Sequence, residues 1–228
     1  MLILVAHGTR SAVGLQTIGE ISDAVSRRIG PLRMAFVDVL GPNPAEVLSG
    51  AAEPAIVMPA FLASGYHVHT DLPARIAESG RTDAGVTAPL GPDPVLGAVM
   101  HDRLIEAGWR PGDVVVMAAA GSSDPRARRD VYCVARMLGQ HVGEVHLGFV
   151  ATGAPRVHDV VGVLRANGRR RIFVAPYLLA HGLFHDRLTR CGATAVAAPL
   201  GAHPGVVDVI TARFTPLGAD PTRQPAKA

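Results

Sequence analysis

Two histidines, His7 and His67, stand where side chains often do chemistry in α/β proteins. His7 directly follows an apolar run at residues 2–6, and His67 follows the apolar run at residues 55–62, two positions after Gly65. A neutral imidazole is a good ligand for Fe, Co, Ni and Zn, and its pKa of about 6.5 makes it a base near neutral pH. The pair is therefore a candidate for holding a divalent metal and accepting protons. A single histidine after a strand is more often a loop or capping residue, so this chemistry is predicted for the pair and not for either histidine alone.

The elements around these histidines alternate between strand-like and helix-like patterns. Runs rich in Val, Ile and Leu at residues 2–6, 55–62, 114–120 and 172–179 predict strands buried on both faces. Apolar residues at three- and four-residue spacing predict helices at 15–29, 94–107 and 130–140. This alternation predicts an α/β fold with parallel, doubly wound sheets. Ligands of such sheets bind beyond the carboxyl ends of the strands, where both histidines are expected.

The chain contains an internal repeat. The segment APLG at residues 88–91 recurs at 198–201, and three further echoes follow in the same order with offsets of 110 to 117 residues. A tandem duplication explains this order. We expect an N-terminal lobe at residues 1–110, a degenerate C-terminal lobe at 111–214 and a flexible tail at 215–228. The turn signal Pro111-Gly112 lies at the join.

The two halves differ at the candidate site. Ala120 stands where the repeat would place His7, and Phe184 follows Gly182 by the two positions that separate His67 from Gly65. One half thus keeps imidazoles where the other has apolar groups. This asymmetry predicts a reactive N-terminal half that faces a wall-forming C-terminal half.

Composition limits the class of protein. The 228 residues carry a net charge of +3 and only two cysteines, which excludes a disulfide scaffold and a four-thiolate metal site. The apolar start is too short for a signal peptide, and no uninterrupted apolar stretch reaches membrane-spanning length. We expect a cytoplasmic protein with no membrane or nucleic-acid partner; the triple Arg169-Arg170-Arg171 is interpreted as a solvated turn.

Several strings resemble a known family. VAHGTR at residues 5–10, FLASGYHV at 61–68 and DLP at 71–73 resemble the sirohydrochlorin chelatases, the ATP-independent class II chelatases of siroheme and cobalamin biosynthesis. APYLL at 175–179 and GLFHDRL at 182–188 resemble the C-terminal half of the two-domain members. The resemblance extends from residue 1 to about residue 212 of this sequence.

The resemblance implies two α/β lobes that face each other across a cleft and insert Co²⁺ or Fe²⁺ into sirohydrochlorin. It assigns His7 and His67 as the catalytic, metal-binding residues. The metal would be a substrate rather than a permanently bound cofactor, because two imidazoles hold an ion loosely enough to release it to four ring nitrogens. Imidazole pairs accept several divalent ions, so neither the metal nor the pathway is fixed. A duplicated chain supplies both lobes itself, so we expect a monomer.

A flat macrocycle with several carboxylates needs an apolar wall and a cationic rim. Candidates for the wall are Phe61, Leu62, Tyr66, Leu183 and Phe184, and candidates for the rim are Arg10, Arg75 and Arg187. Simple solvation is the alternative for each arginine.

Four polar residues have weaker claims. Asp38 ends the strand-like run at residues 34–39 and is a possible proton relay or histidine partner, with a loop cap as the alternative. His69 would share a face with His67 in an extended segment. His181 and His185 flank Gly182 and are candidates to line the cleft, or else surface residues.

Two other functions remain open. A non-catalytic metal or tetrapyrrole carrier would use the same histidines, and only turnover separates it from a chelatase. A histidine phosphatase also opens with a strand and His-Gly, but that chemistry requires an Arg directly before the His, and Ala6 occupies this position.

Overall fold

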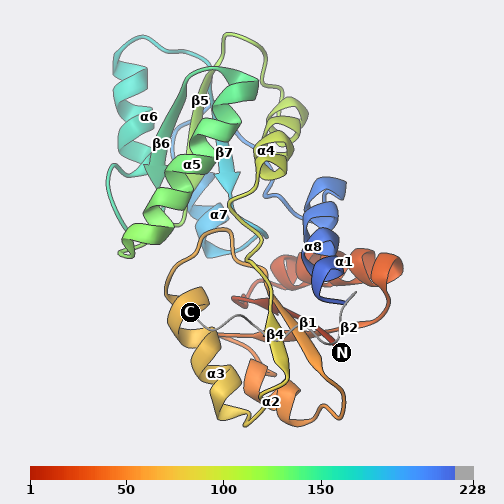
Figure 1. Ribbon diagram of the computed structural model, residues 1–228. Coiled ribbons are helices and arrows are strands. Elements are labelled where there is room, and N and C mark those ends of the chain that lie inside the picture. The colour runs from red at the N-terminus through yellow and green to blue at the C-terminus, as the bar shows by residue number, and fades with distance from the viewer. Residues whose placement is uncertain (219–228) are drawn as a thin grey trace.

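A computed structural model describes residues 1–218, and two parallel four-stranded sheets form its framework (Figure 1). The first sheet has the order β2-β1-β3-β4 and the second the order β6-β5-β7-β8. The strands are β1 (Leu2–Ala6), β2 (Leu32–Phe36), β3 (Ala55–Pro59), β4 (Ala84–Val86), β5 (Val114–Ala119), β6 (Val145–Phe149), β7 (Ile172–Tyr177) and β8 (Ala195–Val196). The predicted α/β class with two parallel sheets is confirmed.

Helices connect successive strands and cover the sheets. They are α1 (Ala12–Ile29), α2 (Pro44–Ser49), the π-helix η1 (His67–Asp71), α3 (Leu72–Glu78), α4 (Pro94–Glu106), α5 (Pro125–Val142), α6 (Val157–Ala166), α7 (Leu183–Leu188) and α8 (Pro204–Gly218). Side-chain caps begin several of them, as Ser11 does for α1 and Asp124 for α5. The three predicted helices are present, and α5 is longer than its apolar spacing indicated.

The duplication extends to single hydrogen bonds beyond the central strands. The amides of Val37 and Asp38 donate to the carbonyls of Ala6 and His7 at 3.1 Å. In the second half the amides of Val150 and Ala151 donate to Ala119 and Ala120 at 2.9 Å. The two halves therefore build the same loop beyond β1 and β5, although His7 of the first loop is replaced by Ala120 in the second.

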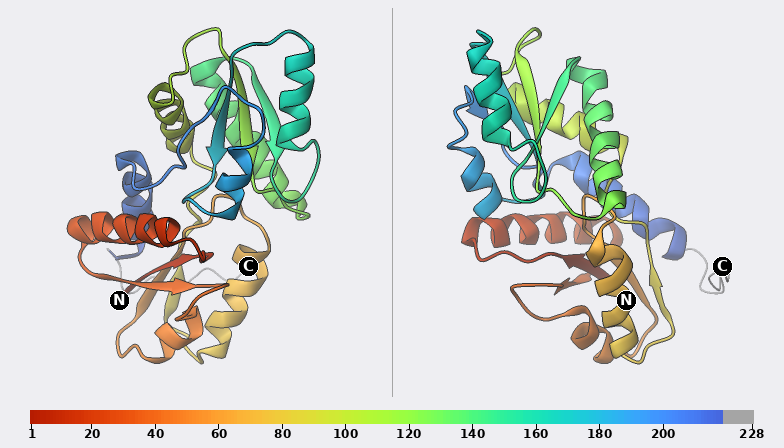
Figure 2. Two further views of the ribbon diagram at one scale, coloured as in Figure 1. Left: turned by 180° about the vertical axis from the view of Figure 1, so that it is seen from behind. Right: turned by 90° about the vertical axis from the view of Figure 1, so that its left-hand side faces the viewer.

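The last helix of each half packs on the other half. Helix α4 contacts β7 and α5, whereas α8 contacts β3 and α1. We define the N-terminal lobe as the first sheet with α1, α2, η1, α3 and α8, and the C-terminal lobe as the second sheet with α4, α5, α6 and α7. Figure 2 shows the two lobes against each other, with α8 beside α1.

Matching arginines on the exchanged helices hold the repeated APLG segments. Arg103 of α4 donates to the carbonyl of Leu200 at 3.1 Å, and Arg213 of α8 donates to the carbonyl of Pro89 at 3.2 Å. Arg213 also pairs with Asp93 at 3.0 Å. One apolar cluster includes Met58 of β3, Met100 of α4, Phe173 of β7 and Ile210 of α8. The lobes therefore share a core.

The predicted boundary near residue 110 is the turn between α4 and β5. The two sequence repeats meet at this turn, but α4 and α8 each pack against the other half of the chain. Residues 215–218 of the expected tail belong to α8, and residues 219–228 lie outside the described part of the chain. Within residues 1–218, no helix is long and apolar enough to cross a membrane.

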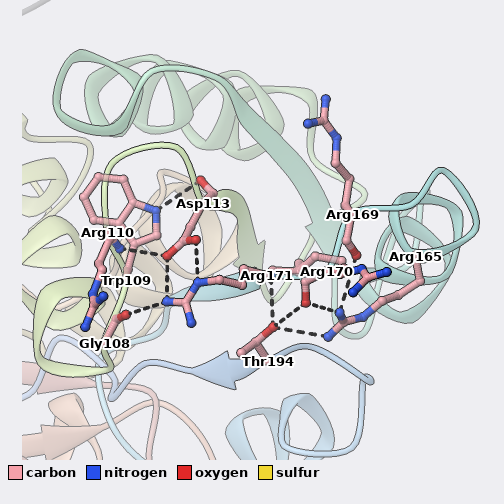
Figure 3. Close-up of polar contacts among 10 residues, drawn as sticks. Gly108, Trp109, Arg110, Asp113, Arg165, Arg169, Arg170, Arg171 and Thr194 are labelled. Atoms are coloured by element: carbon pink, nitrogen blue, oxygen red, sulfur yellow. Dashed lines mark hydrogen bonds and ion pairs between the residues drawn. The ribbon is translucent and has the colours of Figure 1, made fainter.

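The triple arginine is partly structural. Arg171 forms two hydrogen bonds with the carboxylate of Asp113, at 2.6 and 2.9 Å, and donates to the carbonyl of Gly108 at 3.0 Å (Figure 3). Asp113 in turn accepts from the amide of Arg110. Arg169 and Arg170 are exposed, as a solvated turn requires, but Arg171 ties the start of β7 to the turn before β5.

Candidate active site

A cavity of about 570 Å³ lies between the lobes. Much of its lining comes from residues at or just beyond the carboxyl ends of β1, β3, β5 and β7, which is where ligands of parallel sheets bind. Most of the lining is apolar, and imidazoles are its main titratable groups: His7, His181 and His185.

His7 follows β1 on a loop that requires glycine. Gly8 has φ +95°, and a Cβ at this position would overlap the carbonyl oxygen of Asp38. The loop therefore passes close to the segment after β2, and His7 is left exposed at the cavity. Sterics and the positive φ therefore explain why a glycine directly follows His7.

The structure brings His7 and His67 together. Their ring centroids are 4.8 Å apart, with planes inclined at 59°. Phe61, on the cavity wall, stacks on His67 at 5.6 Å and 21°, while Tyr66 meets the same ring edge-on at 5.7 Å. His67 itself begins η1 rather than lying in a loop. The two imidazoles are close enough to bind one ion together.

A carboxylate fixes the orientation of His67. Nδ1 of His67 lies 3.0 Å from Oδ2 of Asp71, and Arg75 lies 3.6 Å from the other oxygen of that carboxylate. An ionised carboxylate only accepts, so Nδ1 carries the proton and Nε2 keeps its lone pair. A ligating histidine is commonly held in this way. Asp71 therefore has the role that the sequence analysis considered for Asp38.

The loop that carries His67 is fastened to the opposite lobe. The hydroxyl of Tyr177 in β7 donates to the carbonyl of Leu62 at 2.7 Å, and the amide of Ser64 donates to Asp130 of α5 at 2.7 Å. Burial raises the pKa of Tyr177, so its hydroxyl stays protonated and able to donate. Neither Tyr177 nor Asp130 was predicted from the sequence to be a positioning residue.

Asp38 lies two residues past the end of β2, because the strand stops at Phe36. Its carboxylate accepts from the neighbouring amide of Val39 at 2.8 Å, which corresponds to the loop-cap alternative. His69 is exposed, and it belongs with His67 to η1 rather than to an extended segment in which the two would share a face.

The residues predicted to contact substrate divide into two groups. Arg10, Phe61, Leu62, Leu183 and Phe184 line the cavity. Tyr66 is 61% exposed and packs on His67 outside that lining.

Two of the candidate rim arginines have other contacts. Arg75 holds Asp71 and Glu78, and Arg187 borders a separate small hollow beside Cys191. Arg10 is exposed and remains available to a carboxylate at the mouth of the cavity.

His181 and His185 also line the cavity, as one of the two alternatives for them stated. Among residues 1–218, no group of three or more His, Cys, Asp or Glu side chains is placed to hold a metal ion.

The fold and cavity define a class of protein: a duplicated α/β chain with a cavity between its halves and a close imidazole pair of which one member, His7, lines that cavity. The family model CbiX matches this chain twice, over residues 1–107 and 114–217. The chain therefore belongs to the CbiX family, the sirohydrochlorin chelatase family that its motifs resemble.

Relatives are similar along most of their length. A sirohydrochlorin ferrochelatase of Priestia megaterium is 24% identical over 92% of this chain and 87% of its own length. A sirohydrochlorin cobaltochelatase of the same organism is 24% identical over 82% of this chain and 66% of its own.

Solved structures share the fold. SirB from Bacillus subtilis with Fe³⁺ has a TM-score of 0.79 at 22% identity and covers 94% of this chain and 93% of its own. CbiX, described as the terminal enzyme for biosynthesis of siroheme in denitrifying bacteria, has a TM-score of 0.71 at 23% identity, with 94% and 98% covered. Two lobes with parallel sheets are thus the fold of this family.

Proposed function

We propose that this chain is a metal chelatase that inserts Co²⁺ or Fe²⁺ into sirohydrochlorin. The observation that carries the proposal is the pair His7 and His67, whose ring centroids are 4.8 Å apart; His7 lines the cavity between the lobes, and His67 stacks on the lining residue Phe61. Family membership and relatives named as sirohydrochlorin ferrochelatases and cobaltochelatases support the same substrate. The relatives include both metals, so iron and cobalt are both proposed.

The reaction exchanges one divalent ion for two pyrrole N–H protons. Nε2 of His67, free because Nδ1 is committed to Asp71, supplies a lone pair to the ion. His7 supplies the second imidazole, as a ligand or as the base that takes up the two pyrrole protons one after the other and releases each to solvent. Two protein ligands leave the remaining coordination positions to water and to the ring nitrogens, so the ion passes on instead of staying bound.

The cavity fits a flat macrocycle with acidic side chains. Phe61, Leu62 and Phe184 offer apolar surface to the ring, and Arg10 offers a guanidinium to a carboxylate. On this proposal the metal is a substrate and no cofactor is held permanently. We further propose that the protein acts as a cytoplasmic monomer, since one chain supplies both walls of the cavity.

The test is loss of the absorbance of metal-free sirohydrochlorin in the presence of Co²⁺ or Fe²⁺. We expect His7→Ala and His67→Ala each to lower the insertion rate at least about 100-fold. His158→Ala, at a side chain 72% exposed, is the matched control and keeps the wild-type rate. Wild-type rates in both active-site variants would overturn the site.

A carrier is the second candidate, because binding uses the same ligands. A carrier would take up stoichiometric metal or tetrapyrrole and stop, whereas a chelatase metallates many equivalents per chain. Insertion in excess over enzyme decides between them.

A further inference from the structure

A second pair of imidazoles lies on the C-terminal wall of the cavity. The ring centroids of His181 and His185 are 4.6 Å apart, with planes inclined at 74°. This separation nearly equals the 4.8 Å between His7 and His67. Two imidazoles that bind one ion at metal–nitrogen distances of about 2.0–2.1 Å have centroids about 5 Å apart. Both pairs therefore have the spacing of a two-histidine chelate.

The protonation of His185 suits a metal ligand. Its Nε2 lies 3.1 Å from the carbonyl oxygen of Ala197, and a carbonyl only accepts. Nε2 therefore carries the proton, and Nδ1 keeps a lone pair. This is the same kind of support that Asp71 gives His67, with a backbone carbonyl in place of a carboxylate.

The loop that carries His181 is pressed against the N-terminal lobe. A Cβ on Gly14 of α1 would overlap the carbonyl oxygen of His181, and a Cβ on Gly182 would lie 3.1 Å from the hydroxyl of Thr9. Thr9 follows His7 by two residues and also lines the cavity. The loops that carry His7 and His181 thus meet at one cavity.

We propose that His181 and His185 form a second divalent-metal site, which receives Co²⁺ or a similar ion before it passes to His7 and His67. The site takes ions that imidazole binds well, such as Co²⁺, Fe²⁺, Ni²⁺ and Zn²⁺. Its role in supplying the reaction rests on the proposed chelatase function, whereas its affinity for metal does not.

The experiment titrates the full-length chain with Co²⁺ alone, by equilibrium dialysis and calorimetry. The His7→Ala/His67→Ala double variant is expected to retain one class of Co²⁺ sites. Adding His181→Ala weakens that remaining class at least about tenfold. His158→Ala is again the control and leaves every site unchanged. No Co²⁺ binding in the double variant, or binding unaffected by His181→Ala, overturns the proposal.

A second variant replaces the ligand instead of removing it. In the double-variant background, His181→Cys is expected to bind Co²⁺ with a thiolate-to-cobalt charge-transfer absorption, because thiolate is also a ligand for this ion. Absence of that absorption in a folded variant, checked by circular dichroism, contradicts direct ligation by residue 181.

Steady-state kinetics of insertion distinguish a failure of the second metal site from a failure of the proposed chelatase function. We expect His181→Ala to raise the KM for Co²⁺ about tenfold while kcat changes less than about twofold, since the site supplies the ion and does not insert it. If both pairs bind Co²⁺ but sirohydrochlorin is not metallated, the proposed function fails and the site stands. If insertion proceeds and His181→Ala changes neither Co²⁺ binding nor KM, the site fails and the function stands.

Discussion

The phenol of Tyr177 reaches across the lobe interface and donates a 2.7 Å hydrogen bond to the carbonyl of Leu62. The donor ends β7 of the C-terminal lobe, and the acceptor begins the loop that leads to His67 in the N-terminal lobe. Gly91 makes room for the bond, because a Cβ there would overlap both the hydroxyl and the carbonyl. The position of the His67 imidazole therefore depends on a residue of the opposite lobe.

Removing this hydroxyl tests the dependence. Tyr177→Phe leaves the carbonyl of Leu62 without its donor, which is expected to lower the free energy of unfolding by about 1–2 kcal/mol. The insertion rate should fall by about tenfold or more, since small displacements of a reacting group are costly. Thermal unfolding and the sirohydrochlorin assay measure both effects. Tyr132→Phe, at a ring 49% exposed, should change neither, and equal effects in both variants would contradict the positioning role.

Asp71, and not Asp38, supplies the carboxylate that orients His67, and matched substitutions test this difference. Asp71→Asn is expected to lower the insertion rate about 10- to 100-fold, because the partner of Nδ1 no longer accepts as an anion. Asp38→Asn should stay within about twofold of wild type, because its carboxylate caps the loop by accepting from the amide of Val39. The same assay, run with Co²⁺ in excess, compares the two. If Asp38→Asn lowered the insertion rate more than Asp71→Asn does, Asp38 would instead be the proton relay.

Alanine substitutions at two glycines of α1 test whether this helix presses on the His181 loop. Gly14→Ala places a methyl against the carbonyl of His181 and should destabilise the chain by about 1–3 kcal/mol while displacing the His181 loop. Gly19→Ala meets open space and should stabilise the same helix by about 0.5–1 kcal/mol. Urea unfolding of both variants measures the difference. Stabilisation in both would show that α1 does not press on the loop.

The Arg171–Asp113 pair predicts a pH dependence of stability. The hydrogen-bonded guanidinium of Arg171 holds the pKa of Asp113 below its usual value. The folded state therefore favours the carboxylate, so the pair stabilises the fold above about pH 4 and loses this effect as pH falls through the lowered pKa.

Asp113→Asn should accordingly unfold at lower urea concentration than wild type at pH 7, with a difference that narrows below pH 4. Asp23→Asn, at an exposed position of α1, is the control and should show no such narrowing. A difference that stays constant from pH 7 to pH 3 would exclude the ion pair as its cause.

Much of the fold was predictable because the central strands are buried on both faces. Val115–Met117 and Val57–Met58 have essentially no exposed side-chain surface, and such strands appear in the sequence as continuous apolar runs. The exchange of α4 and α8 was not predictable, because an apolar helix face shows that a helix is buried but not against which sheet. The strand expected up to residue 39 ends at Phe36, where the loop turns and Val39 takes a positive φ of 69°.

The candidate site was predictable only in part. His7 and His67 stand out because each follows a strand, and the structure places them together. Asp71 is four residues after His67, a spacing that brings side chains together only in a helix, and no helix was predicted for this segment. Tyr177 and Asp130 act across more than sixty residues of sequence, so no local pattern identifies them. His185 carries no sign in the sequence of its bond to Ala197.

The exchanged helices make each half of the duplicated sequence an incomplete folding unit. Helix α4 lies within residues 1–107 but packs on β7 of the second half. Strand β3 of the first half is covered by α8, which comes from the other end of the chain. A single protease cut in the turn at residues 108–113 would thus leave two fragments that stay associated, because a helix of each packs on the other. They would separate only by withdrawing both helices from the shared apolar core.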